Sequence, residues 1–294
     1  MDWLMRMNRA LDYIEVNLSG EIELKEVAGQ ACCSSHQFQR MFSFITNVSL
    51  GEYIRRRRLT LAAIELQNSK IKVVDIALKY GYESPVSFAR AFQSLHGVNP
   101  AMAREEGTAL KAYPRLSFLI SIKGETAMNY RIETKDSFQI FGIEKVFQVN
   151  GEDTPANLWK QSHEHGEVER LAANAGDHPD FLNEHYHKVH AVCSYQKTGE
   201  DTFPYMLCAF KNEMSKTEGY TSVMIPAHTW AIFSSDLFTW DQFNETIETL
   251  YKRFYSEWIP TTGYEQVDGL EFEITGEKDG LNFVELWFAV RKIS

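Results

Sequence analysis

Residues 75–100 read DIALKYGYESPVSFARAFQSLHGVNP, and residues 27–48 carry a related sequence, VAGQACCSSHQFQRMFSFITNV. The two stretches align with an offset of 49 residues before a central turn and 50 after it, so that Ser34 pairs with Ser84. A regular offset of this kind indicates a duplicated supersecondary unit. Each copy has a short helical pattern, a tight turn and a second helical pattern that opens at the serine, a favoured N-cap residue. The sequence therefore predicts two tandem helix-turn-helix motifs.

The first hundred residues show the apolar spacing of helices throughout. We expect helices over residues 3–18, 23–30, 35–44, 50–68, 73–79 and 85–96, with a short helix after Pro100. Ser84 and Pro85 support a helix start at 85, because proline at the first helical position loses no hydrogen bond. Helix 50–68 is the longest and joins the two repeats, so it sets their separation. Residues 105–111 are the predicted linker.

After residue 113 the apolar period changes to two, which indicates β-strands. The alternation begins with Leu116, Phe118, Ile120 and Ile122. Further strands are expected at 130–132, 139–148, 189–195, 205–210, 222–225, 229–234, 270–274 and 282–290. Helical stretches at 157–173 and 240–258 interrupt the strands. Because this order of strands and helix repeats, we expect an α+β domain with an internal duplication.

The charge of the chain is divided unevenly between the two predicted domains. The whole chain has a formal net charge of −10. Residues 1–108 contain 13 Lys and Arg and 12 Asp and Glu, and residues 109–294 contain 17 Lys and Arg and 28 Asp and Glu. The first domain is therefore nearly neutral, without the strongly basic profile that identifies many nucleic-acid binders. The acidic second domain is expected to attract cations and to repel phosphate.

Cysteine spacing and hydropathy bear on the compartment. The four cysteines show no paired spacing, which favours free thiols in a reducing environment. The chain has no apolar run near the ~18 residues of a membrane span and no leader with a basic and then an apolar stretch. We therefore expect a soluble, cytoplasmic protein without membrane contact.

The chain resembles the AraC/XylS family of transcription regulators in its Rob-type arrangement, in which a GyrI-like effector-binding domain follows the DNA-binding domain. The first resemblance is carried by residues 38–42, 49–55 and 75–100, and the second by 130–132, 140–143, 258–265 and 284–288. The resemblance implies a multidomain fold. An all-α tandem helix-turn-helix domain over 1–108 would precede an α+β GyrI-like domain over 112–294, with an antiparallel sheet and a pseudo-twofold duplication.

The resemblance also implies three partners: double-stranded DNA, a small effector and RNA polymerase. Base-contacting residues are expected on the second helix of each motif, at His36, Gln39 and Arg40 and at Val86, Ser87 and Arg90. Residues at i, i+3 and i+4 share a helix face. Arginine can bind guanine and glutamine can pair with adenine in the major groove. Two such helices suit successive major grooves about 34 Å apart, although an ordinary polar helix face has the same composition.

The run from Arg55 to Arg58 covers more than half a helical turn, so its four side chains cannot all face DNA. We expect one or two of them, Arg55 first, to meet phosphates and the others to be solvated or to pair with Glu52.

Two positions depart from the family pattern. Cys32 stands where the family usually has glycine, which predicts a turn that is less left-handed or slightly strained. Pro85 and Val86 stand where the family often has polar residues. The second reading helix is therefore expected to contribute phosphate and thymine-methyl contacts more than hydrogen-bond readout.

Glu285 is the predicted anchor of the effector site. Strand alternation puts Phe283, Glu285 and Trp287 on one face, and an acid among aromatic rings seeks a cation or a donor. In GyrI-like domains a glutamate on this strand lies in the ligand pocket, so the resemblance implies a cationic or amphipathic effector, as in multidrug binding. Candidate pocket walls for cation–π contact are Trp159, Tyr205, Trp230 and Trp287, each of which could instead be core.

Other functions remain open at this point. Some GyrI-like proteins hydrolyse strained-ring compounds, and Glu285 with a tyrosine could act as the base and its orienting group. A domain that only contacts other proteins would leave the pocket shallow or filled. The histidines between 163 and 190 lack the spacing of a zinc site, and no phosphate-binding glycine loop is present. We expect a non-enzymatic regulator without metal or cofactor.

Overall fold

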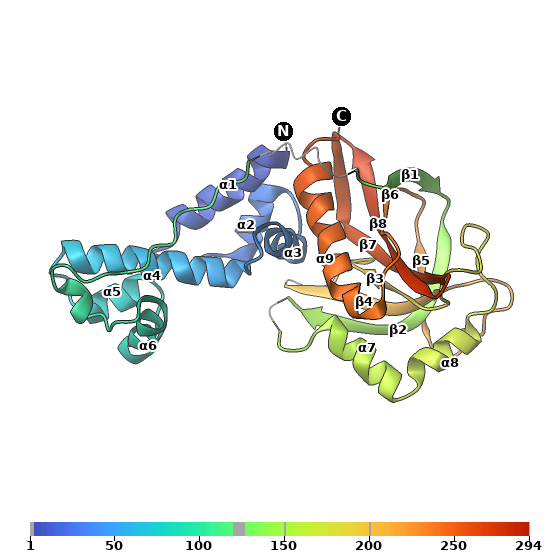
Figure 1. Ribbon diagram of the computed structural model, residues 1–294, viewed down its shortest axis with the longest axis horizontal. Helices are drawn as coiled ribbons and strands as arrows, with labels where there is room; N and C mark the ends of the chain where they lie inside the picture. The colour runs from blue at the N-terminus through green and yellow to red at the C-terminus, as the bar shows by residue number, and fades with distance from the viewer. Residues whose placement is uncertain (1–2, 120–126, 150, 200, 294) are drawn as a thin grey trace. The chain divides into compact units, whose positions relative to one another are not determined.

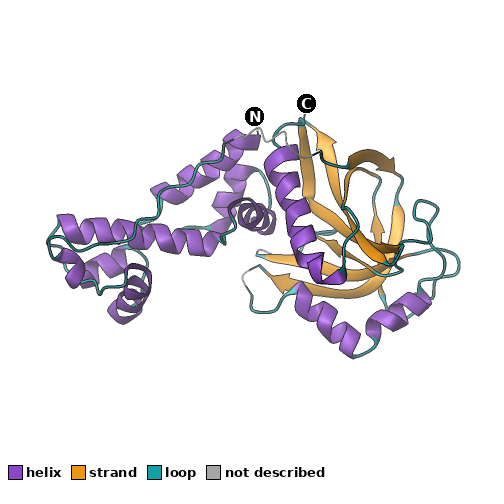
Figure 2. Ribbon diagram, viewed as in Figure 1, coloured by secondary structure: helices purple, strands orange, loops and turns teal. Residues whose placement is uncertain are grey.

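The computed structural model describes residues 3–119, 127–149, 151–199 and 201–293. The chain divides into two compact units: a mainly helical unit made up of residues 1–32 and 38–119, and a unit made up of residues 33–37 and 120–294 that contains the sheet (Figure 1). Figure 2 shows the same division by secondary structure, with the strands confined to the second unit. In the described part of the chain, no helix combines the length and the apolar character needed to cross a membrane.

The helical unit contains the two predicted repeats. Its helices are α1 (Trp3–Val16), α2 (Leu24–Ala31), α3 (Ser35–Thr46), α4 (Leu50–Asn68), α5 (Val73–Lys79), α6 (Pro85–His96) and the 3₁₀ turn η1 (Met102–Arg104). α2 and α3 form the first helix-turn-helix, α5 and α6 form the second, and α4 joins them. The bounds of α4, α5 and α6 equal the predicted ones, and α4 and α6 each begin at a serine whose side chain caps the helix.

The turns of the two repeats share a left-handed residue. Cys32 has φ 57° and ψ 42°, and the equivalent Gly81 has φ 77°. The turn at Cys32 is therefore left-handed, like that at Gly81. Of the two predicted alternatives, a less left-handed turn or a strained one, the second applies, because a residue with a side chain disfavours this conformation. At Gly81 the left-handed backbone itself favours glycine, and a Cβ there would in addition displace the end of the Arg58 side chain, whose Nη1 would lie 2.8 Å away.

Residues 113–119 form no strand, which corrects the prediction of β-structure directly after residue 113. Instead the backbone of Phe118 bonds to the side chain of Asn8 through both its N (3.0 Å) and its O (2.9 Å). The Phe118 ring is buried against Phe42. The apolar alternation of Leu116 and Phe118 therefore serves packing on the helices, and the helical unit extends beyond residue 108. Ile120 and Ile122 lie outside the described residues.

The sheet unit is one eight-stranded antiparallel sheet in the order β1-β6-β8-β7-β3-β4-β2-β5. Its elements are β1 (Tyr130–Lys135), β2 (Phe138–Gln148), α7 (Pro155–Glu164), α8 (Glu167–Asn174), β3 (His190–Cys193), β4 (Thr202–Phe210), β5 (Thr221–Ile225), β6 (His228–Ser234), η2 (Trp240–Gln242), α9 (Phe243–Arg253), η3 (Phe254–Trp258), β7 (Tyr264–Lys278) and β8 (Leu281–Lys292).

The strand order confirms the predicted duplication. One half runs β2, α7–α8, β3, β4, and the other runs β6, α9, β7, β8, with β3 and β7 paired at the centre. β1 precedes β2 in the chain but pairs with β6, and β5 precedes β6 but pairs with β2. The strand that precedes each half in the chain therefore pairs with the other half, β1 with β6 and β5 with β2.

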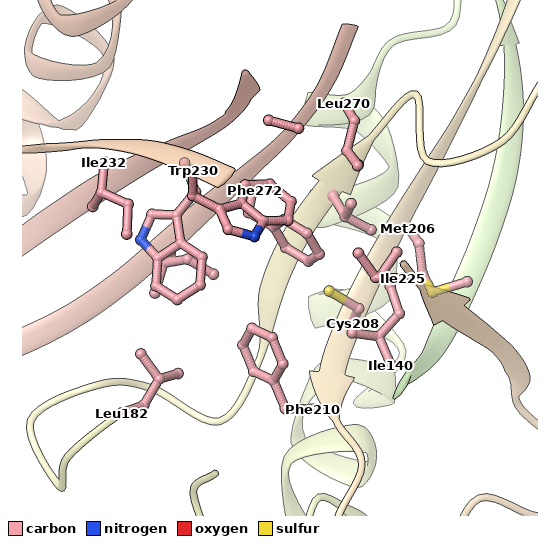
Figure 3. Close-up of a cluster of buried hydrophobic side chains, with 14 residues drawn as sticks. Ile140, Leu182, Met206, Cys208, Phe210, Ile225, Trp230, Ile232, Leu270 and Phe272 are labelled. Carbon is pink, nitrogen blue, oxygen red and sulfur yellow. The ribbon is translucent and has the colours of Figure 1, made fainter. Parts of the chain in front are cut away.

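Alternation along the strands separates two faces of this sheet. On the helix face, Phe233 of β6 and Phe288 of β8 pack against Phe254. The opposite face, called here the cluster face, carries a buried apolar set called the aromatic cluster (Figure 3). It consists of Ile140, Leu182, Val192, Met206, Cys208, Phe210, Ile225, Trp230, Ile232, Leu270, Phe272, Ile274, Trp287 and Ala289.

The predicted helices of this unit are interrupted. The stretch 157–173 forms two helices because Gly166, with φ 66°, ends the first and caps the second. The stretch 240–258 is a 3₁₀ turn, an α-helix and a π-turn in succession. β7 is longer than the predicted 270–274, and its pairing with β8 shifts register between Gln266 and Glu271. That irregularity breaks the apolar alternation that the prediction relied on.

Candidate DNA interface and effector site

The second helix of each repeat opens with the same side-chain cap. Ser34 Oγ accepts a hydrogen bond from the backbone N of Gln37 at 3.2 Å, and Ser84 Oγ accepts one from the N of Ser87 at 3.1 Å. These caps lie at equivalent positions of the repeat. They fix the first turns of α3 and α6, the part of a reading helix that contacts base edges.

One face of α6 is exposed from its first turn onward. Val86 has an exposed fraction of 68%, and Ser87 and Arg90 are exposed as well. The opposite face buries Phe88 and Phe92 in the core of the helical unit. The three residues predicted to meet DNA from this helix therefore lie together on the side that is free to enter a groove.

The three residues predicted for the other groove lie on α3. His36, Gln39 and Arg40 are spaced so that their side chains leave the helix on one side, while Phe42 is buried. The guanidinium of Arg40 lies 5.3 Å from the ring centre of Phe44, which supports the side chain along its own helix.

α4 sets the separation of the two reading helices. It has 19 residues, which corresponds to about 28 Å at 1.5 Å per residue. α3 lies near its start and α6 near its end (Figure 1). This length is close to the repeat of about 34 Å between successive major grooves on one side of a duplex.

The arginine run has mainly structural partners. Arg55 and Arg56 both donate to the carboxylate of Glu52, as the sequence suggested for part of the run. Arg57 binds both carboxylate oxygens of a glutamate on α1, and its side chain is only 11% exposed. Arg58 donates to the backbone O of Leu18 at 3.0 Å. Arg55, 39% exposed in its side chain, remains the candidate for phosphate contact.

In the sheet unit, Glu285 lies on β8 with an exposed fraction of 4%. Arg131 donates two hydrogen bonds to its carboxylate, from Nη1 at 2.6 Å and from Nη2 at 3.0 Å. Ser234 Oγ and Trp287 Nε1 each donate a further bond at 2.9 Å. The bond from Trp287 shows that the acid and this indole share a face. Arg131 supplies the cation that a buried acid needs.

The electrostatics of this group follow from its hydrogen bonds. Burial alone raises the pKa of Glu285, but the bonds from Arg131 and Trp287 outweigh burial and lower that pKa below its usual value. Glu285 is therefore an anion at neutral pH. Tyr186 is the neighbouring tyrosine: burial, and then the charge of Glu285, raise its pKa to about 12.

Lys135 is a second cation of this site, which sequence reasoning missed together with Arg131. Its Nζ lies 4.7 Å from the ring centre of Trp287 and 4.8 Å from that of Phe181. Both cations lie on β1, where Arg131, Glu133 and Lys135 alternate with more exposed residues. That alternation of charges in the sequence was the available signal. Whether β1 lies near Glu285 depends on strand pairing and register, which the sequence does not reveal.

The four predicted aromatic walls do not line one pocket. Trp230 and Trp287 belong to the aromatic cluster, whereas Tyr205 and Trp159 lie on the helix face, where Trp159 Nε1 donates to the Tyr205 hydroxyl at 2.9 Å. The prediction of a shared wall is wrong because Tyr205 lies at a position of β4 whose side chain points away from the cluster. Within the described residues, Trp230 Nε1 is buried without a hydrogen-bond partner.

The segment between α8 and β3 covers the aromatic cluster. Leu182 is buried in it, and Phe181 and Tyr186 pack against it. Backbone bonds with β7 hold the segment, from His187 N to Thr275 O at 2.9 Å and from Glu277 N to His185 O at 2.8 Å. Gly276 permits this approach, since a Cβ there would lie 2.5 Å from the O of His185. The cluster is therefore closed in this state of the protein.

Comparisons with known proteins match both units. The family described as integron-associated effector binding protein (Cass2) matches residues 131–290, and the helix-turn-helix domain family matches residues 27–106. The transcriptional activator AarP of Providencia stuartii is 40% identical over 102 residues, which cover 35% of this chain and 76% of AarP. The chain belongs to the AraC family of transcription regulators and to the Cass2 effector-binding family.

Other relatives and a solved structure are similar to parts of this chain. SoxS of Salmonella typhimurium is 39% identical over 83 residues, or 28% of this chain and 78% of SoxS. The right origin-binding protein of Escherichia coli is 31% identical over 143 residues, 48% of each chain. A solved integron cassette protein of Vibrio cholerae has 16% identity and a TM-score of 0.36, covering 55% of this chain and 95% of its own. The family, fold class and regulatory function predicted from the sequence are confirmed.

Proposed function

We propose that this AraC-type regulator binds DNA as a monomer over two successive major grooves. His36, Gln39 and Arg40 would read one groove from α3, and Val86, Ser87 and Arg90 the next from α6, with Arg55 on a phosphate. The observation that carries the proposal is the repeated capped helix at both ends of α4. Exposed Val86 favours contact with a thymine methyl group over hydrogen-bond readout.

A footprint tests this arrangement. Hydroxyl-radical and methylation protection on a selected operator should reveal two protected major grooves about one helical turn apart. Log affinity should fall steeply with log salt concentration, because phosphate contacts release counterions. Sedimentation of the complex should give one chain per operator. Protection of a single groove, or a need for two chains, would contradict the proposal.

The effector is proposed to be a cationic, amphipathic small molecule bound at the cluster face. The supporting observation is the buried carboxylate of Glu285 beside Trp287, in a site that already holds an ammonium over the same ring. The unpartnered indole N–H of Trp230 would suit an acceptor on the same molecule. Binding would require movement of the covering segment that contains Phe181 and Leu182.

Glu285→Gln tests this site, because it keeps shape while removing the charge. Tetraphenylphosphonium is a suitable probe; it is bound in a solved structure that covers 56% of this chain with 14% identity and a TM-score of 0.44. Titration calorimetry should give at least about tenfold weaker binding of this cation, or about 1.5–3 kcal/mol for a charge-assisted contact. Neutral triphenylphosphine oxide should be nearly unaffected.

Asp153→Asn is the matched control, since Asp153 is an exposed carboxylate paired with Lys145 at 2.5 Å. Equal affinity for the cation in the wild type and in Glu285→Gln would place the anchor elsewhere.

A non-enzymatic role is proposed for the sheet unit, and hydrolysis of strained rings is the alternative. Glu285 and Tyr186 do adjoin one another, which favours that alternative geometrically. However, Glu285 accepts four hydrogen bonds, and its pKa is lowered. Both effects make it a weak general base. If the wild type hydrolyses a strained-ring electrophile, and this activity is lost in Glu285→Gln and in Tyr186→Phe, the sheet unit is an enzyme.

The remaining proposed partner is RNA polymerase. Because AarP is described as a transcriptional activator, we propose that DNA-bound protein contacts RNA polymerase in the cytoplasm. In-vitro transcription from the selected operator, with and without the protein, would test this contact.

A further inference from the structure

The first strand of the sheet unit brings two cations to the cluster face. Arg131 is bound to Glu285 through both of its terminal nitrogens. Lys135 Nζ lies over Trp287 and Phe181 at 4.7 and 4.8 Å. The side chain of Lys135 is only 9% exposed, so its ammonium has little contact with water and interacts strongly with the two rings.

The charges of this site already balance. Glu133 lies between the two cations, accepting hydrogen bonds at 2.7 Å from both Arg131 and Lys135, and Glu285 is the second carboxylate. Two cations thus face two anions. A third cation over the rings would leave a net positive charge beside Glu285 and Lys135, whose side chains are only 6% and 9% exposed, and repulsion between like charges is strong where exposure to water is low. An organic cation can therefore enter with balanced charge only if a resident cation leaves.

The two resident cations are held unequally. Arg131 has its two bonds to Glu285, a third to Glu133 and a fourth to Ser234 Oγ at 3.3 Å. In the described part of the chain, Lys135 donates to Glu133 alone, whose side chain is 38% exposed. A lysine also has a flexible four-carbon stem at the end of which the ammonium can reach water. Lys135 is therefore the cation that can leave.

We propose that Lys135 is the resident cation of the effector site and that a cationic effector binds by taking its place over Trp287 and Phe181. This inference rests on the proposed function, since it names what the effector must displace. If an effector must displace Lys135, this lysine lowers the affinity of the wild-type protein for cations. Only effectors that contact the rings more extensively than an ammonium group does will then bind well.

The test is calorimetric titration of the full chain with tetraphenylphosphonium. Lys135→Met keeps the length of the side chain without its charge, so the cation should bind about tenfold more tightly, as expected for removal of a desolvated competitor of this kind. Lys135→Arg keeps a cation and should bind as the wild type does. Lys135→Gln repeats the loss of charge in case methionine disturbs the strand.

Lys145→Met is the matched control. Lys145 also lies over a ring, with Nζ 5.5 Å from the centre of Phe147, and it pairs with a carboxylate, that of Asp153. Its loss changes the net charge equally, but it lies outside the aromatic cluster, so the affinity should not change. Triphenylphosphine oxide should not gain from Lys135→Met. An equal gain for this neutral compound would mean that Lys135 only fills space, and would overturn the inference.

The outcomes separate this inference from the proposed function. If the wild type binds the cation and Glu285→Gln weakens it, while Lys135→Met and Lys135→Gln leave affinity unchanged or lower, the displacement is refuted and the effector site stands. If neither the wild type nor the Lys135 variants bind the cation, both are refuted. Binding that becomes measurable only in Lys135→Met and Lys135→Gln supports both.

Discussion

Arg57→Met should strongly destabilise the helical unit, although Arg57 stands in a run that sequence alone associates with DNA. Its Nε and Nη2 bind the two carboxylate oxygens of Glu15 at 2.9 and 2.7 Å, and its Nη1 donates to the backbone O of Tyr113 at 2.6 Å. The side chains of the pair are 11% and 10% exposed. Removing the arginine leaves a buried carboxylate with Tyr53 as its remaining neutral donor, a change that typically costs about 3–5 kcal/mol.

The pH dependence has a definite sign. Burial alone raises the pKa of Glu15, but bonds from Arg57 and Tyr53 lower it overall. Such a carboxyl contributes stability that is complete above its unfolded pKa of about 4.3 and is lost as the pH falls through the folded pKa. In Arg57→Met burial prevails, so protonation of Glu15 relieves the defect. The difference in unfolding free energy between the two proteins should therefore shrink from pH 7 to pH 4.

Urea unfolding of residues 1–119 measures this difference. Trp3 is the only tryptophan in that segment, and its ring centre lies 6.3 Å from that of Phe118, so its fluorescence reports the fold. Arg55→Met is the control: its pair with Glu52 is more exposed and should contribute about 0–1 kcal/mol. Equal losses in both variants, independent of pH, would refute the reasoning.

Two further predictions concern the repeats. Arg40→Ala should weaken binding to the operator by about 1–3 kcal/mol and relax base preference at one position, whereas Arg56→Ala should weaken binding to all DNA sequences alike or have no effect. Competition assays on single-base operator variants distinguish these results, and an unchanged specificity ratio in Arg40→Ala would mean that α3 is misassigned as a reading helix. Cys32→Gly should stabilise the helical unit by up to about 1 kcal/mol, because it relieves a left-handed residue that has a side chain; a loss of stability in urea unfolding would contradict the assignment of strain.

The helical unit could be predicted nearly completely from the sequence. Its helices are short, and Ser34, Ser49 and Ser84 mark where three of them begin, so local chemistry decides their bounds. The failure came at residues 113–119, where apolar alternation suggested a strand. Packing of Phe118 on the helices needs the same alternation, and the pattern alone cannot separate the two.

The candidate effector site could be predicted from the sequence only in part. Local alternation correctly joined Glu285 to Trp287, because both lie on one strand. Arg131 and Lys135 were missed because they reach the site from a strand 150 residues earlier in the chain, through the pairing of β1 with β6 and of β6 with β8. Tyr205 was misplaced for a similar reason, since which face of β4 meets the cluster depends on the register of its neighbours.

We propose that one chain carries two coupled sites, one that reads an operator and one that binds a cation. Fluorescence anisotropy of a labelled operator, titrated with the full-length protein with and without saturating tetraphenylphosphonium, tests this most directly. If the two sites are coupled, the cation changes operator affinity by about fivefold or more, and the operator changes the affinity for the cation by the same factor. Operator affinity that stays the same when the cation is demonstrably bound would contradict it.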